Sequence, residues 1–119
     1  MNITERQEPA ALVVAPVGRV DMQSADTLRG YLMPRVEACG LSGETLVLDF
    51  AGIDYISSAG LRVLMLAAKK AKAAGGTLSV AAMQPVVREI FEISRFDKIL
   101  PCFGDVEAAL AAASSRPAP

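Results

Sequence analysis

The sequence of 119 residues contains no histidine and no tryptophan, and it has only two cysteines. A nucleophilic serine needs a neighbouring base, which histidine most often supplies, and the chain also lacks a Ser-x-x-Lys motif. Neither a GxGxxG motif nor a phosphate-binding P-loop is present. Cys39 and Cys102 are far apart and form no CxxC pair, so we expect buried thiols. These absences predict a protein that is not an enzyme and that needs no metal and no cofactor.

Long hydrophobic runs and an excess of charge are also missing. Hydrophobic residues make up 52% of the chain, but charged residues, glycine or proline interrupt every apolar run well before the ~20 residues that span a bilayer. The first residues, MNITERQEP, do not resemble a signal peptide. The 12 basic and 13 acidic residues give a net charge of -1, which provides no general attraction to nucleic acid or anionic membrane. We therefore expect a cytoplasmic protein that binds neither.

Short apolar runs rich in β-branched residues alternate with helical patterns. A weaker alternation at 2–7 favours an edge strand that pairs with the first apolar run through a turn at 8–10. The alternation of strands and helices predicts an α/β fold with a mostly parallel central sheet of about four to five strands and about four helices. We expect one domain over 1–113 and a disordered tail over 114–119, which is polar and proline-rich. The predicted strands are 11–17, 45–50, 77–82 and 99–103.

The first and third helical patterns each predict a buried face. In the first, at 24–39, we expect Ser24 as the N-cap, Gly40 as the stop, and a kink or early end at Pro34. The third helix begins at Pro85, and a last, alanine-rich helix extends from Asp105 to about Ala113. The predicted buried faces are Ala25, Leu28, Leu32, Val36 and Cys39 in the first helix, and Val86, Val87, Ile90, Phe91 and Ile93 in the third.

Residues 53–64, IDYISSAGLRVL, place two serines and a glycine between a strand and a helix. In α/β sheets the functional crevice tends to lie beyond the carboxyl ends of the strands, so we interpret 51–60 as a loop at such a position. One interpretation is that Ser57 or Ser58 caps the following helix. Another is that one of the two hydroxyls serves chemistry. Asp21, Asp49 and Asp54 could meet at the same end of the sheet, but no spacing in the sequence supports a metal site.

The second helical pattern, at 61–74, has an unusual outer face. Helical projection places Arg62, Lys69 and Lys72 on that face, together with the apolar Met65 and Leu66. Apolar side chains among cations suggest a docking patch for a partner with an acidic rim, unless another element such as the last helix covers them. The arc expected to face the sheet contains Leu61, Leu64, Ala67, Ala68, Ala71 and Ala74.

Together these motifs resemble the STAS domains of anti-sigma factor antagonists. The resemblance covers most of the chain, from 16 to 100. It rests on a G-x-apolar-D strand end at 18–21 and on a strand followed by an aromatic, apolar, serine and glycine loop at 48–50 and 55–61. A glycine-bearing helix end at 74–76 completes it. The fold expected from the resemblance is a single STAS-like α/β domain.

The resemblance also implies a partner switch. In such families the unphosphorylated protein binds an anti-sigma factor, which is also a serine kinase of the histidine-kinase-like ATPase fold, and thereby frees a sigma factor. The kinase then phosphorylates the serine two positions before the loop glycine, here Ser58, and a PP2C-type phosphatase reverses the modification. Many members carry aspartate where this chain has Ser57, so Ser57 is a second, less favoured acceptor.

A partner-binding surface follows from the resemblance and from the outer face of the second helix. Two alternatives to the partner switch remain open. One is a constitutive STAS adaptor subunit, for example of a transporter ATPase, in which Ser58 is only a cap. The other is a module that binds a nucleotide or another small ligand. The residues expected at the surface are Asp21, Asp54, Tyr55, Ser57, Ser58, Ala59, Gly60, Arg62, Met65, Leu66 and Lys69.

Overall fold

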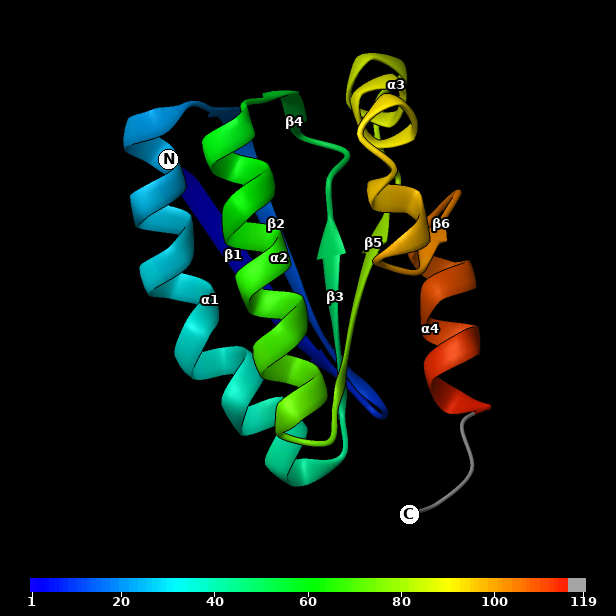
Figure 1. The fold of residues 1–119 in the computed structure, drawn as a ribbon. Helices are drawn as coiled ribbons and strands as arrows, with labels where there is room; N and C mark the ends of the chain where they lie inside the picture. Colours follow the sequence, from blue (N-terminus) through cyan, green and yellow to red (C-terminus); the bar gives the residue numbers. More distant parts are fainter. Residues whose placement is uncertain (116–119) are drawn as a thin grey trace.

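The computed structural model describes residues 1–115, which form a mostly parallel sheet covered by helices on both faces (Figure 1). The strand order is β1-β2-β3-β5-β6, and β4 also pairs with β2. Among the strands within residues 1–115, only β1 runs antiparallel to its neighbour. This confirms the predicted α/β class and the mostly parallel sheet. The strands are β1 (Asn2–Glu8), β2 (Ala11–Val20), β3 (Thr45–Asp49), β4 (Ile53–Ile56), β5 (Thr77–Ala81) and β6 (Cys102–Phe103).

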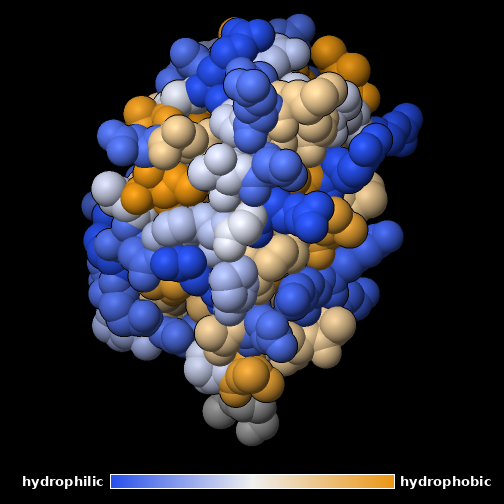
Figure 2. Space-filling view, turned by 90° about the vertical axis from the view of Figure 1, so that its left-hand side faces the viewer, coloured by the Kyte–Doolittle hydropathy of each residue, from blue (hydrophilic) through white to orange (hydrophobic). Residues whose placement is uncertain are grey.

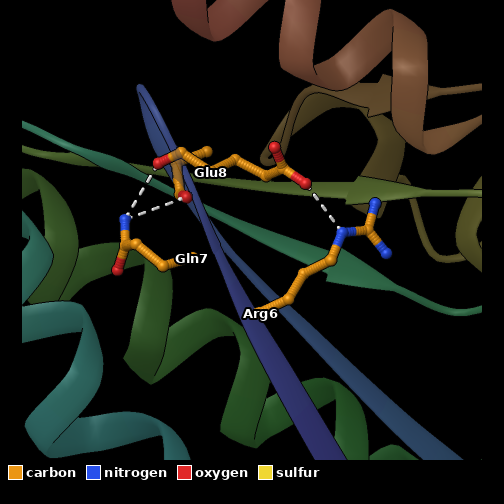
Figure 3. A network of polar contacts seen from close by, with 4 residues as sticks. Arg6, Gln7 and Glu8 are labelled. Atoms are coloured by element: carbon orange, nitrogen blue, oxygen red, sulfur yellow. Dashed lines mark hydrogen bonds and ion pairs between the residues drawn. The ribbon is translucent and has the colours of Figure 1, made fainter.

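The predicted edge strand is confirmed as β1, which forms a hairpin with β2. Polar side chains hold its end in place: the Gln7 amide donates to the carbonyl oxygens of Glu8 and Ala11, at 3.0 and 3.2 Å. Arg6 pairs with Glu8 at 2.9 Å. Figure 3 shows Arg6 and Glu8 on one side of the strand and Gln7 on the other, as strand alternation requires.

The β2 strand has two parallel partners in succession. Its first half, from Ala11 to Val14, pairs with β3, whereas Gly18 to Val20 pair with β4, with a bulge between Gly18 and Arg19. Gly18 has a φ of 121°, which favours glycine. The prediction that 51–60 is entirely loop is therefore wrong, and β2 extends three residues past the predicted end at 17. Ile53 and Ile56 are both buried, which explains why this short segment joins the sheet.

Two helices, α1 (Met22–Ser42) and α2 (Ser58–Ala73), lie side by side on one face of the sheet, and α4 (Val106–Ser114) lies on the other (Figure 1). The strands between them are buried on both faces. Leu46 and Leu48 belong to the large core under α1 and α2, whereas Val47 belongs to a smaller core under α4. This double burial explains the continuous apolar run that predicted β3.

The buried stripe predicted for α1 is confirmed, but its predicted ends are wrong. The N-cap is Asp21 and the C-cap is Gly43, whose φ is 80°. The helix also continues past Pro34 to Ser42, because that proline is exposed and the core holds the helix on both sides of it. Gly40 lies inside the helix against Ala74, where an added Cβ would collide with the Ala74 side chain.

Helix α3 (Pro85–Ile93) begins at Pro85 as predicted, near the end of the sheet where the parallel strands finish (Figure 1). Its buried face is narrower than predicted, because Val86 and Ile93 are 54% and 76% exposed. Phe91 is fully buried and makes edge contacts with the rings of Phe50 and Phe96. A short 3-10 helix, η1 (Phe96–Lys98), precedes β6.

Helix α4 begins at its N-cap Asp105 and continues to Ser114, one residue into the predicted tail. Residues 116–119 of that tail lie outside the described residues. Cys39 is buried, and burial raises the pKa of its thiol to about 11, whereas Cys102 is only partly buried. Within residues 1–115, no helix is both long and apolar enough to cross a membrane.

Candidate functional site

The starts of α1 and α2 lie next to each other at the carboxyl ends of β2 and β4. The backbone N–H of Ser57, which follows β4, donates to the carbonyl of Val20 at 2.8 Å. Asp21 directly follows Val20 and caps α1, and Ser57 caps α2. This hydrogen bond, together with the pairing of β2 and β4, holds the two predicted site residues, Asp21 and Ser57, at neighbouring positions.

The side chain of Asp21 is occupied by the start of α1. Its carboxylate accepts the backbone N–H of Ser24 at 2.9 Å, and the Ser24 hydroxyl accepts the backbone N–H of Asp21, also at 2.9 Å. This is a reciprocal capping box. The hydrogen bond from the Ser24 backbone is the main reason that the pKa of Asp21 is below its ordinary value.

Ser57 and Ser58 have different environments at the start of α2. The hydroxyl of Ser57 accepts the backbone N–H of Gly60 at 3.2 Å, so Ser57 is the residue that caps the helix. Ser58 is exposed in the first turn, and its hydroxyl forms no hydrogen bond with any residue that the structure describes. The first of the two serines thus has a structural role, and the second hydroxyl is accessible.

Gly60 is buried and cannot itself contact a partner. A Cβ at this position would lie 2.6 Å from Val20 Cγ1 and 2.7 Å from Ile56 Cγ1. The lack of a side chain lets the start of α2 approach β2 and β4 closely. Gly60 therefore acts through packing, which sets the position of the serine turn.

A groove of about 210 Å³ separates the first halves of α1 and α2, beside the serine turn. Ala59 lines it directly after Ser58, and Arg62 and Leu66 line it further along α2. Met22, which is 80% exposed, and Leu66, which is 45% exposed, present apolar surface at the groove. The facing residues from α1 are Met22, Ala25, Asp26 and Arg29.

Sequence reasoning missed Met22, Asp26 and Arg29 as candidate site residues. Each lies on the exposed side of α1, and helical periodicity indicates only which side faces the core. The available signal for a site was the presence of Met22 and Arg29 on the exposed side near the start of the helix. Which helix lies opposite that cluster depends on tertiary packing.

The remaining predicted surface residues are only partly brought together. Lys69 is exposed, whereas Met65 is half-buried against the large core. The prediction that Met65 belongs to an open patch is therefore wrong. The last helix does not cover it, since α4 lies on the opposite face of the sheet. Asp54 is exposed on β4, and the neighbouring Tyr55 ring packs under the guanidinium of Arg19 at 4.3 Å.

The acidic residues at this end of the sheet do not form a metal site in the part of the chain that the structure describes. Within residues 1–115, no three histidine, cysteine or acidic side chains lie close enough together to hold a metal ion. Asp49 instead accepts the backbone N–H of Ala51 at 3.1 Å.

The side of the molecule that carries α1 is largely hydrophilic, with separate hydrophobic patches (Figure 2).

The model of the STAS domain family matches residues 2–109. The chain belongs to the STAS domain family. This STAS domain is 40% identical over 113 residues to BtrV of Bordetella bronchiseptica, which is classed provisionally as an anti-sigma factor antagonist, and the match covers 94% of each chain.

Solved structures share the fold of this STAS domain. A Thermotoga maritima protein, also classed provisionally as an anti-sigma factor antagonist, has a TM-score of 0.84 at 13% identity, with 94% of each chain covered. The anti-sigma factor antagonist SpoIIAA has TM-scores of 0.67 in its unphosphorylated form and 0.62 in its phosphorylated form, the latter from Bacillus. The identities are 15% and 16%, and the matches cover 97% and 93% of this chain and 100% and 99% of SpoIIAA.

Proposed function

We propose that this STAS domain is an anti-sigma factor antagonist that works by partner switching. Its unphosphorylated form binds an anti-sigma factor, which is also a serine kinase of the histidine-kinase-like ATPase fold, and this binding releases a sigma factor. The kinase phosphorylates Ser58 and so abolishes binding, and a PP2C-type phosphatase restores it. The exchange takes place in the cytoplasm, and the STAS domain itself supplies no catalytic group.

The observation that carries the proposal is the environment of the Ser58 hydroxyl. It is exposed and makes no hydrogen bond within residues 1–115, whereas the neighbouring Ser57 hydroxyl is engaged as the helix cap. A kinase can reach the Ser58 hydroxyl without disturbing the helix. The likeness of this STAS domain to BtrV, over nearly the full length of both chains, supports the assignment to this class of protein.

The groove beside Ser58 supports a partner with an apolar side chain surrounded by acidic groups. Arg29 and Arg62 outnumber Asp26 among the charged residues that line it, and Met22 and Leu66 supply apolar contact area. Apolar side chains within a polar rim are the usual composition of a specific protein interface. We expect complementary charge on the partner to orient the complex.

The same geometry explains how a phosphate would act. A phosphoserine adds roughly -1.5 to -2 charges, and at a helix N-terminus the dipole favours it by about 0.3 to 1 kcal/mol. Phosphorylation of Ser58 therefore leaves the STAS fold intact. Its effect falls on the complex, because a dianion at the rim of the groove repels the acidic groups of the partner and must be desolvated when the partner binds.

The decisive experiment is mass spectrometry of the intact protein and its peptides after incubation with ATP and the histidine-kinase-like ATPase encoded nearest its gene. We expect one phosphate, located on Ser58. Ser58→Ala should remove it. The matched control is Ser57→Asn, which removes the other hydroxyl but keeps a side chain that caps helices as well as serine does.

Two outcomes would contradict the proposal. A phosphate on Ser57, lost in Ser57→Asn and retained in Ser58→Ala, would overturn the assignment of the acceptor. Tight binding to the ATPase without any phosphate would favour the constitutive adaptor, in which Met22, Arg62 and Leu66 form a permanent contact surface. Alanine substitution at these three positions would then identify that contact.

A further inference from the structure

Arg62 lies between the serine turn and the groove. It follows Ser58 by four residues on α2, so the two residues are about 40° apart around the helix and about 6 Å apart along it. Arg62 also lines the groove between α1 and α2, whereas Ser58 lies beside it. A long side chain on a helix covers the turn that precedes it, which here is the turn of Ser58. One guanidinium can therefore reach both the Ser58 hydroxyl and a partner in the groove.

The Arg62 guanidinium is available for such a contact. Arg62 is exposed, and within residues 1–115 it forms no ion pair, hydrogen bond or ring contact. Arg19 and Arg35, by contrast, each lie over a tyrosine ring, and Arg35 also pairs with Glu5. Asp26 lines the same groove as Arg62 but forms no ion pair with it. No acidic group of the described chain therefore occupies Arg62 while Ser58 is unmodified.

The chemistry of a phosphoserine matches that of this guanidinium. A phosphoserine carries roughly -1.5 to -2 charges and three strong acceptor oxygens. A guanidinium binds phosphate with two parallel N–H donors. On a helix, an acidic group four residues before a basic one is the favourable orientation. Ser58 and Arg62 have both this spacing and this order.

We propose that phosphorylated Ser58 pairs with Arg62 of the same helix and thereby withdraws Arg62 from the partner. This inference rests on the proposed function, because it explains how the phosphate weakens binding. In the unmodified protein, Arg62 and Arg29 are cations of the groove and attract the acidic groups of the partner. Once the phosphate holds Arg62, the charges of Arg29 and Asp26 cancel, so the groove loses its net positive charge. The phosphate then competes from within the protein for a residue that the partner needs.

The first test is a ³¹P NMR titration of the full chain, with phosphoserine inserted at position 58 during translation so that no kinase is required. A guanidinium beside the phosphate stabilises the dianion and lowers its pKa. Arg62→Gln should therefore raise the pKa of the phosphate, and its proton affinity should be about threefold higher than in the wild type. Arg62→Lys keeps the charge but not the paired donors, and should give an intermediate result.

Lys72→Gln is the matched control. Lys72 is exposed on the same helix, about 21 Å further along than Ser58, and charges at the surface are screened beyond about 8 Å at physiological salt. This variant removes the same charge as Arg62→Gln, and both leave the start of α2 unchanged. The pKa of the phosphate in Lys72→Gln should therefore match that in the wild type.

Partner binding provides the second test. In isothermal titration with the histidine-kinase-like ATPase encoded nearest the gene, phosphorylation should weaken binding about 100-fold in the wild type. The loss should be only about tenfold in Arg62→Gln, which has already given up the cation that the phosphate would occupy.

The inference is overturned if the pKa of the phosphate is the same in the wild type and in Arg62→Gln, or if Lys72→Gln raises it equally. It is also overturned if phosphorylation weakens partner binding equally in the wild type and in Arg62→Gln. A different result would overturn the proposed function: the ATPase would fail to phosphorylate Ser58, while the NMR difference between the wild type and Arg62→Gln would persist.

Discussion

The starts of α1 and α2 are neighbours in space but use their polar side chains differently. At the start of α1, Asp21 and Ser24 are both engaged in the capping box. At the start of α2, Ser57 alone provides the cap, and Ser58 is an additional hydroxyl with no structural partner among residues 1–115. At α2 one residue satisfies the backbone and the next exposes its hydroxyl, which is the arrangement that the proposed switch requires.

The largest expected effect is the loss of partner binding when Ser58 is phosphorylated. We expect the affinity for the anti-sigma factor kinase to fall about 100-fold, which corresponds to about 2.7 kcal/mol. Isothermal titration of the two forms measures this difference, and phosphorylated Ser57→Asn should show the same loss. Equal affinities of the two forms would mean that the free hydroxyl is not a switch.

The next effect concerns the packing that places the serine turn. Gly60→Ala should lower the free energy of unfolding by about 1 to 3 kcal/mol, because the added methyl group overlaps Val20 and Ile56. Gly30→Ala is the matched control, since Gly30 lies exposed in α1 with no atom near its missing Cβ. That change should stabilise the protein by up to about 1 kcal/mol. Urea denaturation measures the free energy of unfolding of both variants. The prediction fails if this free energy changes in the same direction in both.

The two serines should differ in stability as well as in chemistry. Ser57→Ala removes the cap of α2 and should cost about 1 kcal/mol, whereas Ser57→Asn should restore the loss. Ser58→Ala should stay within about 0.5 kcal/mol of the wild type, because its side chain makes no contact that α2 needs. Thermal unfolding followed by circular dichroism measures all three. A larger loss from Ser58→Ala than from Ser57→Ala would reverse the assigned roles.

The smallest effect is the pH dependence of the capping box. The carboxylate of Asp21 has a lowered pKa in the folded state. Its contribution to folding stability is therefore fully present above the ordinary carboxyl pKa and is lost as the pH falls through the folded value. Asn caps as well as Asp but does not titrate. The difference in melting temperature between wild type and Asp21→Asn should therefore change only in acid, below the ordinary pKa. A change near neutral pH would contradict this account.

The sequence was sufficient for the layered fold because its signals are local. The stripe from Ala25 to Cys39 and the doubly buried run in β3 depend only on periodicity. The missed strand, β4, has its two buried isoleucines three positions apart, which does not match strand alternation. Its place in the sheet depends on the bulge of β2 at Gly18, which local periodicity does not reveal.

The candidate site was only partly predictable for a related reason. The serine turn is one continuous stretch, so Ser57 and Ser58 could be identified from their neighbours. The groove combines Met22 and Arg29 of one helix with Leu66 of another, and their proximity requires the packing of α1 against α2. The cap of α1 was placed at Ser24 instead of Asp21, because both residues are polar and belong to the same capping box.

The pairing of β2, first with β3 and then with β4, is made by the backbone, whereas the surface of the groove is made by side chains. Backbone hydrogen bonds, from Gly18 to Gly52 and from Ser57 to Val20, fix the frame in which Ser58 is presented. The exposed side chains that line the groove, such as Met22 and Leu66, lie outside the buried core. Under the proposed function, substitutions at positions such as Met22 and Leu66 would change the partner without moving Ser58.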